Sequence, residues 1–383
     1  MNRMNLSAAI YGGLLAVLLG GAWLKYTAEP ALELDGKVIL LQGTEDELER
    51  LTWLAEKKDQ AVMVKKTDAA GDYWEVTYTK WTEKKAPKVE PPPTEQPAPS
   101  TTEAPAGPSP AAPADPAAPA DPAAPAAATP AAEPTPEPEP EPEYEESVQV
   151  YKAGEEAGKL IKSLSPMLAI RKLSSLDAEK METTGLDKPV EFLEITRKGK
   201  TIKLEVGGEV YGTRDRYVRD TSTQEIFLVD DELLRPLKYA RTRLPDRTLW
   251  SIAPQDITKV AITGKTATVE VVQKNAQDAE KAAWVRADKP DEADEQLKTW
   301  MDKALKLKST SYASTEDSFD GLELKFSMLL TDKKGKTETF EVHAKPDGSG
   351  DWWGKSEHTR GWVKLLKGPT SSLHEDVANI AAD

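Results

Sequence analysis

The side chains most able to do chemistry in this sequence are its histidines and carboxylates. Three histidines, His343, His358 and His374, lie in separate segments and lack the His-Glu-x-x-His spacing of a zinc enzyme. Residues 347–351, DGSGD, are rich in oxygen atoms but lack the spaced acidic ligands and closing Glu of a calcium loop. We interpret them as a hairpin turn. Without a visible pocket, no pair of acidic residues can be assigned as acid and base. We therefore predict no catalytic residue, metal or cofactor.

Nucleotide and nucleophile motifs give the same prediction. Gly207-Gly208 followed by Gly212 is not Gly-x-Gly-x-x-Gly, and no Gly-x-Ser-x-Gly elbow occurs. The chain has no cysteine, which excludes thiolate metal sites, cysteine nucleophiles and disulfides. Its net charge of −15 argues against binding to nucleic acid, which requires a basic face.

Arginines gather in one part of this acidic chain. They are Arg214, Arg216, Arg219, Arg235, Arg241, Arg243 and Arg247. Guanidinium groups bind carboxylates and lipid head groups, so we name Arg214, Arg216, Arg219, Arg241 and Arg243 as a candidate partner surface. An ordinary solvated face is the alternative, because acidic residues such as Asp215 and Asp220 are interleaved with these arginines.

A second candidate surface is aromatic. Trp352, Trp353 and Trp362, with His358 nearby in the sequence, could form a stacking platform for a glycan. Packing in the core is the alternative interpretation. Trp352 and Trp353 are adjacent, so they cannot both point to one side of a strand.

The elements that would position these residues occur twice in the same order. Three alternating runs predict short strands near the start, at 47–53, 62–65 and 73–76, and again at 256–262, 269–272 and 283–286. An amphipathic helix follows each set, at 160–164 and at 297–305. Each helix leads into a strand-rich block with a Lys-Gly-Lys turn and ends in a short helix, at 231–239 and 371–380.

This repetition predicts an α+β fold made of two tandem copies of a mostly antiparallel β module, each with one or two helices. The first copy would comprise residues 31–85 plus 147–245, and the second residues 246–383. Two unrelated antiparallel domains that share only β-propensity are the alternative.

Residues Leu6–Leu24 form an uncharged apolar run bounded by Arg3 and Lys25. At about 1.5 Å per residue the run is long enough to cross a hydrocarbon layer of about 30 Å. We predict a transmembrane helix at 6–25, with residues 1–5 in the cytoplasm and the rest outside the inner membrane, because Arg3 and the N-terminal amine precede the run. A cleaved signal peptide is the alternative.

Residues 86–146 consist mainly of Pro, Ala and Glu. Such a composition cannot bury a core or form a strand ladder, so we predict a disordered, semi-extended spacer. By its place in the repeat, the spacer would be a loop inserted in the first copy. A linker between separate modules is the alternative.

Several short segments resemble the bacterial family called domain of unknown function 4340. They are Gly185–Pro189, Leu204–Gly207, Arg216–Val218, Ile226–Val229 and Leu244–Leu249. The resemblance implies a membrane-anchored, extracytoplasmic, mostly β protein that is often found with ABC-type export and gliding-motility systems. It implies no catalytic residues. The Pro-rich segment departs from the pattern of the family.

We therefore expect a non-catalytic, single-pass membrane protein that acts as an accessory or binding partner of a transport or gliding-type ABC complex. The expected partners are the membrane, through Leu6–Leu24, and a protein of that complex. The alternative is a cell-envelope tether or TonB-like coupler that binds the cell wall or a protein.

Overall fold

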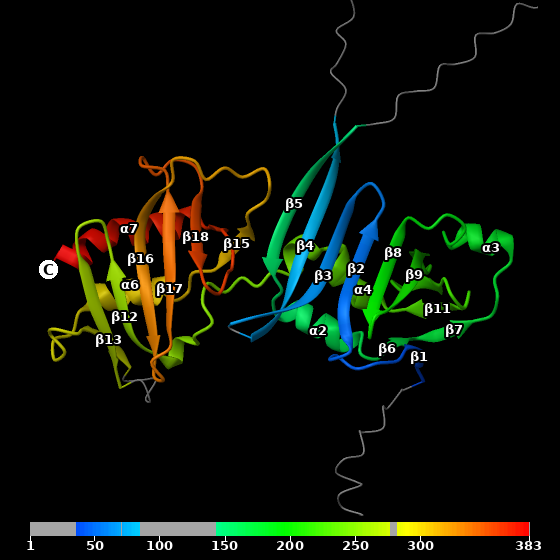
Figure 1. Ribbon diagram of the computed structural model, residues 1–383, viewed down its shortest axis with the longest axis horizontal. Helices are drawn as coiled ribbons and strands as arrows, with labels where there is room; N and C mark the ends of the chain where they lie inside the picture. Colours follow the sequence, from blue (N-terminus) through cyan, green and yellow to red (C-terminus); the bar gives the residue numbers. More distant parts are fainter. Residues whose placement is uncertain (1–35, 70, 85–142, 276–281, 383) are drawn as a thin grey trace, which may run out of the picture. The chain divides into compact units, whose positions relative to one another are not determined.

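A computed structural model describes residues 36–69, 71–84, 143–275 and 282–382. The predicted membrane-spanning run and nearly all of the Pro-rich segment lie outside these residues. Within them, no helix is both long and apolar enough to cross a membrane. The elements are mainly antiparallel strands with a few helices, so the fold is α+β and mostly β, as the sequence predicts (Figure 1).

Nine of the described strands form the first sheet. They are β2 (Leu48–Ala55), β3 (Asp59–Asp68), β4 (Gly71–Glu83), β5 (Tyr144–Lys152), β7 (Arg171–Leu173), β8 (Glu191–Arg197), β9 (Lys200–Glu209), β10 (Arg216–Asp220) and β11 (Ile226–Val229). Their order in the sheet is β5-β4-β3-β2-β8-β9-β10-β11-β7. A separate pair joins β1 (Val38–Leu41) to β6 (Met167–Ala169).

The strands on the two sides of the Pro-rich segment are neighbours in this sheet, since β4 lies between β5 and β3. Farther in, Leu51 of β2 stands opposite both Met63 of β3 and Ile195 of β8. Polypeptide from before and after the segment therefore contributes to one sheet. The predicted end of the spacer, residue 146, is wrong by a few residues, because β5 already begins at Tyr144.

Apolar side chains of the first sheet and of the helices in this module belong to one core. In β8, Leu193 and Ile195 are fully buried, as expected for period-two alternation. Helix α2 (Glu155–Ser163) buries Ala157, Leu160 and Ile161 at spacings of three and four. It contacts α4 (Asp231–Lys238), and the short helices α3 (Ala178–Thr183) and α5 (Ala240–Arg243) complete this module.

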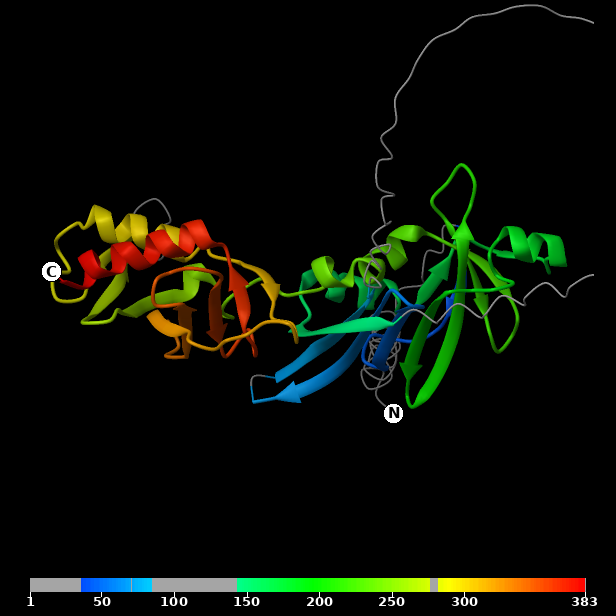
Figure 2. The ribbon, with the colours of Figure 1, turned by 90° about the horizontal axis from the view of Figure 1, so that it is seen from above.

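The second sheet contains eight of the described strands. They are β12 (Ile257–Thr263), β13 (Thr268–Lys274), β14 (Ala283–Arg286), β15 (Ser309–Tyr312), β16 (Glu323–Asp332), β17 (Thr337–Ala344), β18 (Trp352–Ser356) and β19 (Val363–Leu365). A short 3-10 helix, η1 (Pro254–Asp256), leads into β12. Helices α6 (Glu295–Ala304) and α7 (Lys367–Ala382) pack together on one face of the sheet (Figure 2).

Apart from β5, the two sheets have strands in corresponding order. The first is β4-β3-β2-β8-β9-β10-β11-β7, and the second is β14-β13-β12-β16-β17-β18-β19-β15. In each, the outermost strand at the far end, β7 or β15, precedes β8 or β16 in the sequence. The predicted strands and helices are present in both parts, including β14, whose bounds match the predicted 283–286.

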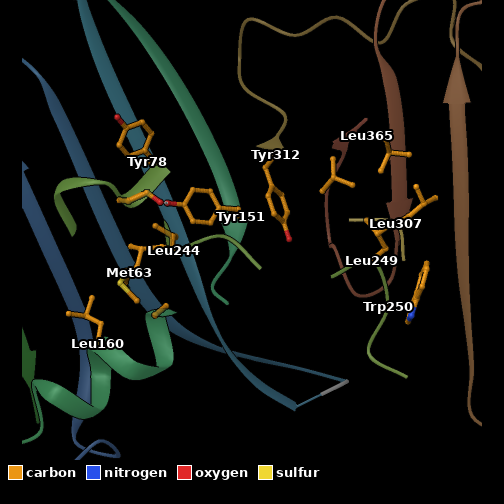
Figure 3. Close-up of a cluster of buried hydrophobic side chains, with 14 of the residues drawn as sticks. Met63, Tyr78, Tyr151, Leu160, Leu244, Leu249, Trp250, Leu307, Tyr312 and Leu365 are labelled. Atoms are coloured by element: carbon orange, nitrogen blue, oxygen red, sulfur yellow. Dashed lines mark hydrogen bonds between the residues drawn. The ribbon is translucent and has the colours of Figure 1, made fainter. Parts of the chain in front are cut away.

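Buried apolar side chains from both sheets belong to one cluster. Near the middle of it, the rings of Tyr151 on β5 and Tyr312 on β15 lie side by side, with centroids 5.7 Å apart (Figure 3). The hydroxyl of Tyr151 donates to the carbonyl of Ala240 at 2.8 Å. These contacts place β5 next to both modules.

Candidate functional site

A group of partly buried polar side chains lies where β5 meets the segment that connects the modules. The backbone N–H of Asp246 donates to the carbonyl of Lys152, and the N–H of Gly154 donates to the carbonyl of Leu244, both at 2.8 Å. Ala153 and Pro245 form an isolated antiparallel bridge. This pairing brings the Lys152 ammonium within 3.0 Å of the Asp246 carboxylate.

His358 enters the same place from the turn after β18. Its Nε2 lies 2.9 Å from Asp246 Oδ2, 2.8 Å from Thr248 Oγ1 and 3.1 Å from Lys152 Nζ. The imidazole is only 9% exposed. We call Lys152, Asp246, Thr248 and His358 the junction cluster, because its members come from β5, from the connecting segment and from the second module.

The junction cluster keeps Asp246 charged. Burial alone raises the pKa of Asp246, but hydrogen bonds from the other three members outweigh it and hold the pKa well below its usual range. The second oxygen of Asp246, Oδ1, accepts from the backbone N–H and the hydroxyl of Thr248 at 3.0 and 2.6 Å. The ionised Asp246 and the Lys152 ammonium therefore form an ion pair in which both charges are compensated.

A second polar group lies close by, at the start of β17. Glu338 is 6% exposed and accepts from the backbone N–H of Ser251 at 2.6 Å and from Lys336 Nζ at 2.7 Å. The hydroxyl of Ser251 also donates to Glu338 and accepts from Lys336 Nζ at 2.6 Å. Burial raises the pKa of Glu338, but the hydrogen bonds from Lys336 and Ser251 lower it overall, which makes this carboxylate a poor base for serine.

Arg360 links the same turn to the tip of the β3–β4 hairpin. Its Nε donates to Asp68 Oδ2 at 2.7 Å, and its guanidinium lies over the ring of Tyr73 at 4.0 Å. Arg360 itself has a left-handed backbone, with φ of +57°. The hairpin and the turn are thereby held together by a charge pair and a cation–π contact.

These three groups border a cleft of about 230 Å³. It is lined by Asp72, Tyr73, Lys152, Ser251, Lys336, Thr337, Glu338, Glu357, His358 and Arg360. Its charged members are engaged with neighbours inside the described part of the chain. Asp72 pairs with Lys65 at 3.4 Å, and Glu357 accepts from the N–H of Thr339 at 2.8 Å. Such a cleft can present hydrogen-bonding groups and an aromatic face to a bound segment.

The sequence singled out arginines and tryptophans instead. Arg216 is 6% exposed; its Nε donates to the carbonyl of Gly207, and it pairs with Glu191 at 2.5 Å. Arg219 pairs with Glu205 at 2.5 Å. Arg214 lies exposed in the β9–β10 turn, and Arg241 and Arg243 are exposed on α5. Arg216 and Arg219 are thus held in ion pairs with other strands of the sheet, and the other three arginines are solvated.

The tryptophans separate by strand alternation. Trp352 belongs to the apolar core, and Trp353 packs against Phe319 with centroids 5.2 Å apart. Trp362 stacks on Phe319, also at 5.2 Å, and meets His343 edge-on at 4.9 Å. The histidine beside Trp362 is therefore His343, and the sequence grouping with His358 is wrong, because His358 belongs to the junction cluster.

Two short-range signals of the junction cluster were present in the sequence. Asp246 follows a proline and stands two residues before Thr248, which is the pattern of an Asx turn. The glycine at position 154 allows the backbone of Asp246 to pass close by, because a Cβ there would lie 2.9 Å from the Cα of Asp246. Neither signal points to His358, which lies 112 residues after Asp246.

Comparison with known protein families gives one match. Residues 153–325 match the family described as domain of unknown function (DUF4340). The match includes Asp246 and Thr248 and excludes Lys152 and His358. Searches of curated proteins and of solved structures each found no significant match. Over residues 153–325, this chain is therefore similar to the DUF4340 family, as the short segments in its sequence suggest.

Proposed function

We propose that this protein is a non-catalytic, membrane-anchored binding protein that works outside the inner membrane as an accessory of a transport or gliding-type ABC complex. Leu6–Leu24 would be its single transmembrane helix, and the cleft beside the junction cluster would receive a segment of a protein partner. The apolar run in the sequence supports the anchor.

The pairing of charged groups around the cleft carries the proposal. Catalysis by proton transfer needs an acid or base whose pKa lies near the working pH. Here the carboxylates of Asp246 and Glu338 have lowered pKa values and are held by neighbouring donors. Groups held in this way are poorly suited to proton transfer, which leaves the cleft that they border as a place for a partner segment to bind.

Gentle detergent extraction tests this proposal directly. Full-length protein should co-purify with subunits of an ABC transporter. Tyr73→Ala, which removes the aromatic wall of the cleft, should reduce the recovered subunits. Tyr211→Ala is the matched control, because Tyr211 is a fully exposed tyrosine outside the residues that line the cleft. A monodisperse lone protein, or equal recovery with both variants, would count against the proposal.

An envelope tether or TonB-like coupler is the second candidate. A coupler of that kind needs its proline-rich segment in series between the anchor and the folded domain. Here the strands that flank the segment, β4 and β5, are neighbours in one sheet, which disfavours a series arrangement. Deleting residues 86–141 leaves both strands whole. Loss of pelleting with peptidoglycan in that variant would favour the tether.

We also propose that the two modules are copies of one unit and that the Pro-rich segment is an insertion in the first. The corresponding strand order and the adjacency of β4 and β5 support both statements. Limited proteolysis within the segment tests the insertion, because the two fragments should stay associated under native conditions. Their separation would leave the linker interpretation standing.

A further inference from the structure

A second cavity, of about 320 Å³, lies within the second module. It is bordered by the β17–β18 turn, by Lys325 of β16, by Trp352 of β18 and by the N-terminal half of α7. The junction cluster contributes nothing to it. Its volume is several times the roughly 30 Å³ that one water occupies, so it has room for a small organic molecule.

Two side chains that line this cavity each carry a buried ring nitrogen with no hydrogen-bond partner among the described residues. These nitrogens are Nε1 of Trp352 and Nδ1 of His374. Trp352 is 2% exposed, and its ring lies 5.7 Å from that of His374. An indole N–H can only donate, so the missing partner of Trp352 must be an acceptor. A buried unmatched donor costs about 1–3 kcal/mol, which a bound acceptor would recover.

Lys325 adds a positive charge to the same cavity. Its side chain is 8% exposed, its ammonium donates to the carbonyl of Pro346 at 3.1 Å, and its carboxylate neighbour, Glu323, lies 3.6 Å away on the exposed side. An ammonium has three donors, so at least one remains for a ligand. A buried cation is stabilised most by an anion that also accepts hydrogen bonds.

The rim limits the charge of that anion. Lys367 and the first turn of α7 favour a negative group, because helix N-termini carry unpaired N–H groups and partial positive charge. Asp347 and Glu375 also line the cavity and would repel a dianion such as phosphate. A monovalent anion with two acceptor oxygens satisfies both conditions.

We propose that this cavity is a binding site for a small carboxylate, in which one oxygen accepts from the Trp352 indole N–H and the other from the Lys325 ammonium. The carboxylate belongs to a free organic acid or to the C-terminus of a peptide. This site is independent of the membrane anchor and of the cleft, so its test does not depend on the function proposed above.

Fluorine NMR of the full-length protein in detergent micelles, labelled with 5-fluorotryptophan, tests the site. The resonance of Trp352 is the one that disappears in Trp352→Phe. Sodium acetate should shift it with saturation, whereas sodium chloride at equal ionic strength should not. A peptide with a free C-terminus, compared with the same peptide amidated, separates the two sources. A stronger response to the free peptide than to acetate would identify a peptide end.

Two substitutions and one internal control complete the experiment. Lys325→Met removes the charge with little change in length and should weaken acetate binding at least tenfold. Lys367→Gln, on the exposed rim, should weaken it less and serves if Lys325→Met does not fold. The resonance of Trp353 on the opposite side of β18 should not respond. Equal shifts with acetate and chloride, or no shift at all, would overturn the proposal and leave a cavity that holds only water.

Discussion

Two polar sites of this protein differ in how their buried groups are partnered. In the junction cluster, the single carboxylate of Asp246 accepts hydrogen bonds from three side chains, those of Lys152, Thr248 and His358. In the second-module cavity, Trp352 and His374 each keep an unpartnered ring nitrogen among the described residues. Buried polar groups stabilise a fold when they are satisfied and cost free energy when they are not. The first site therefore suits a fixed contact between modules, and the second suits a ligand.

Asp246→Ala should give the largest effect. It leaves the partly buried Lys152 ammonium without its counter-charge and removes the acceptor for Thr248. Breaking such a pair costs about 3 kcal/mol of unfolding free energy. Urea unfolding of the full chain measures it. The control is Asp72→Ala, whose side chain is 57% exposed and pairs with Lys65, with an expected loss below about 1 kcal/mol. Equal losses would mean that the junction cluster adds nothing special.

Gly154→Ala should give the next largest effect. A Cβ at this position would lie 2.9 Å from both the Cα of Asp246 and the carbonyl oxygen of Pro245, so backbone must move. Overpacking of this kind costs about 2 kcal/mol. Gly158→Ala is the matched control, because it lies in α2 with nothing within 4 Å, and it should stabilise the protein by about 1 kcal/mol. The same sign for both variants would contradict the close approach.

Acid should remove part of the contribution of Asp246. The folded-state pKa of this residue is lowered, so its stabilisation is present above the unfolded pKa of about 3.9 and is lost as the pH falls toward the folded value. The difference in unfolding free energy between wild type and Asp246→Asn should therefore shrink from pH 7 to pH 3. Urea titrations at both values measure it. A constant difference would show that Asp246 acts through its shape alone.

Long alternating runs made most of the elements predictable from sequence. The stretch 283–286 carried a clear strand pattern, and the amphipathic run 297–305 gave α6. The three-residue strands β6 and β7 are too short for a period to appear, and β15, with the sequence Ser-Thr-Ser-Tyr, has a single large apolar side chain. The strand β5 was not predicted, because its first residues share the Glu-rich composition of the segment before it.

Neither of the two polar sites could be predicted from the sequence. Lys152 and His358 are separated by 206 residues, and only the packing of β5 against the second module joins them. The arginines illustrate the same limit. Glu205, the partner of Arg219, lies on the neighbouring strand β9, and Glu191, the partner of Arg216, lies one strand farther away on β8, and the sequence gives neither the strand order nor the register. In the cavity, Lys325, Trp352 and His374 come from two strands and a helix that meet only in the folded module.

The smallest predicted effect compares two buried tryptophans of the second module. Trp300 is 1% exposed, and its indole N–H donates to the carbonyl of Leu373 at 2.9 Å, whereas Trp352 has no acceptor among the described residues. Replacing either with Phe removes a similar volume, but only Trp300→Phe removes an existing hydrogen bond. We therefore expect Trp300→Phe to cost about 1 kcal/mol more than Trp352→Phe in urea unfolding without added carboxylate. Added acetate should stabilise the wild type and not Trp352→Phe, because only the wild type keeps the donor. If the two variants lose the same free energy and acetate stabilises neither wild type nor variant, Trp352 is already satisfied and the contrast between the two sites disappears.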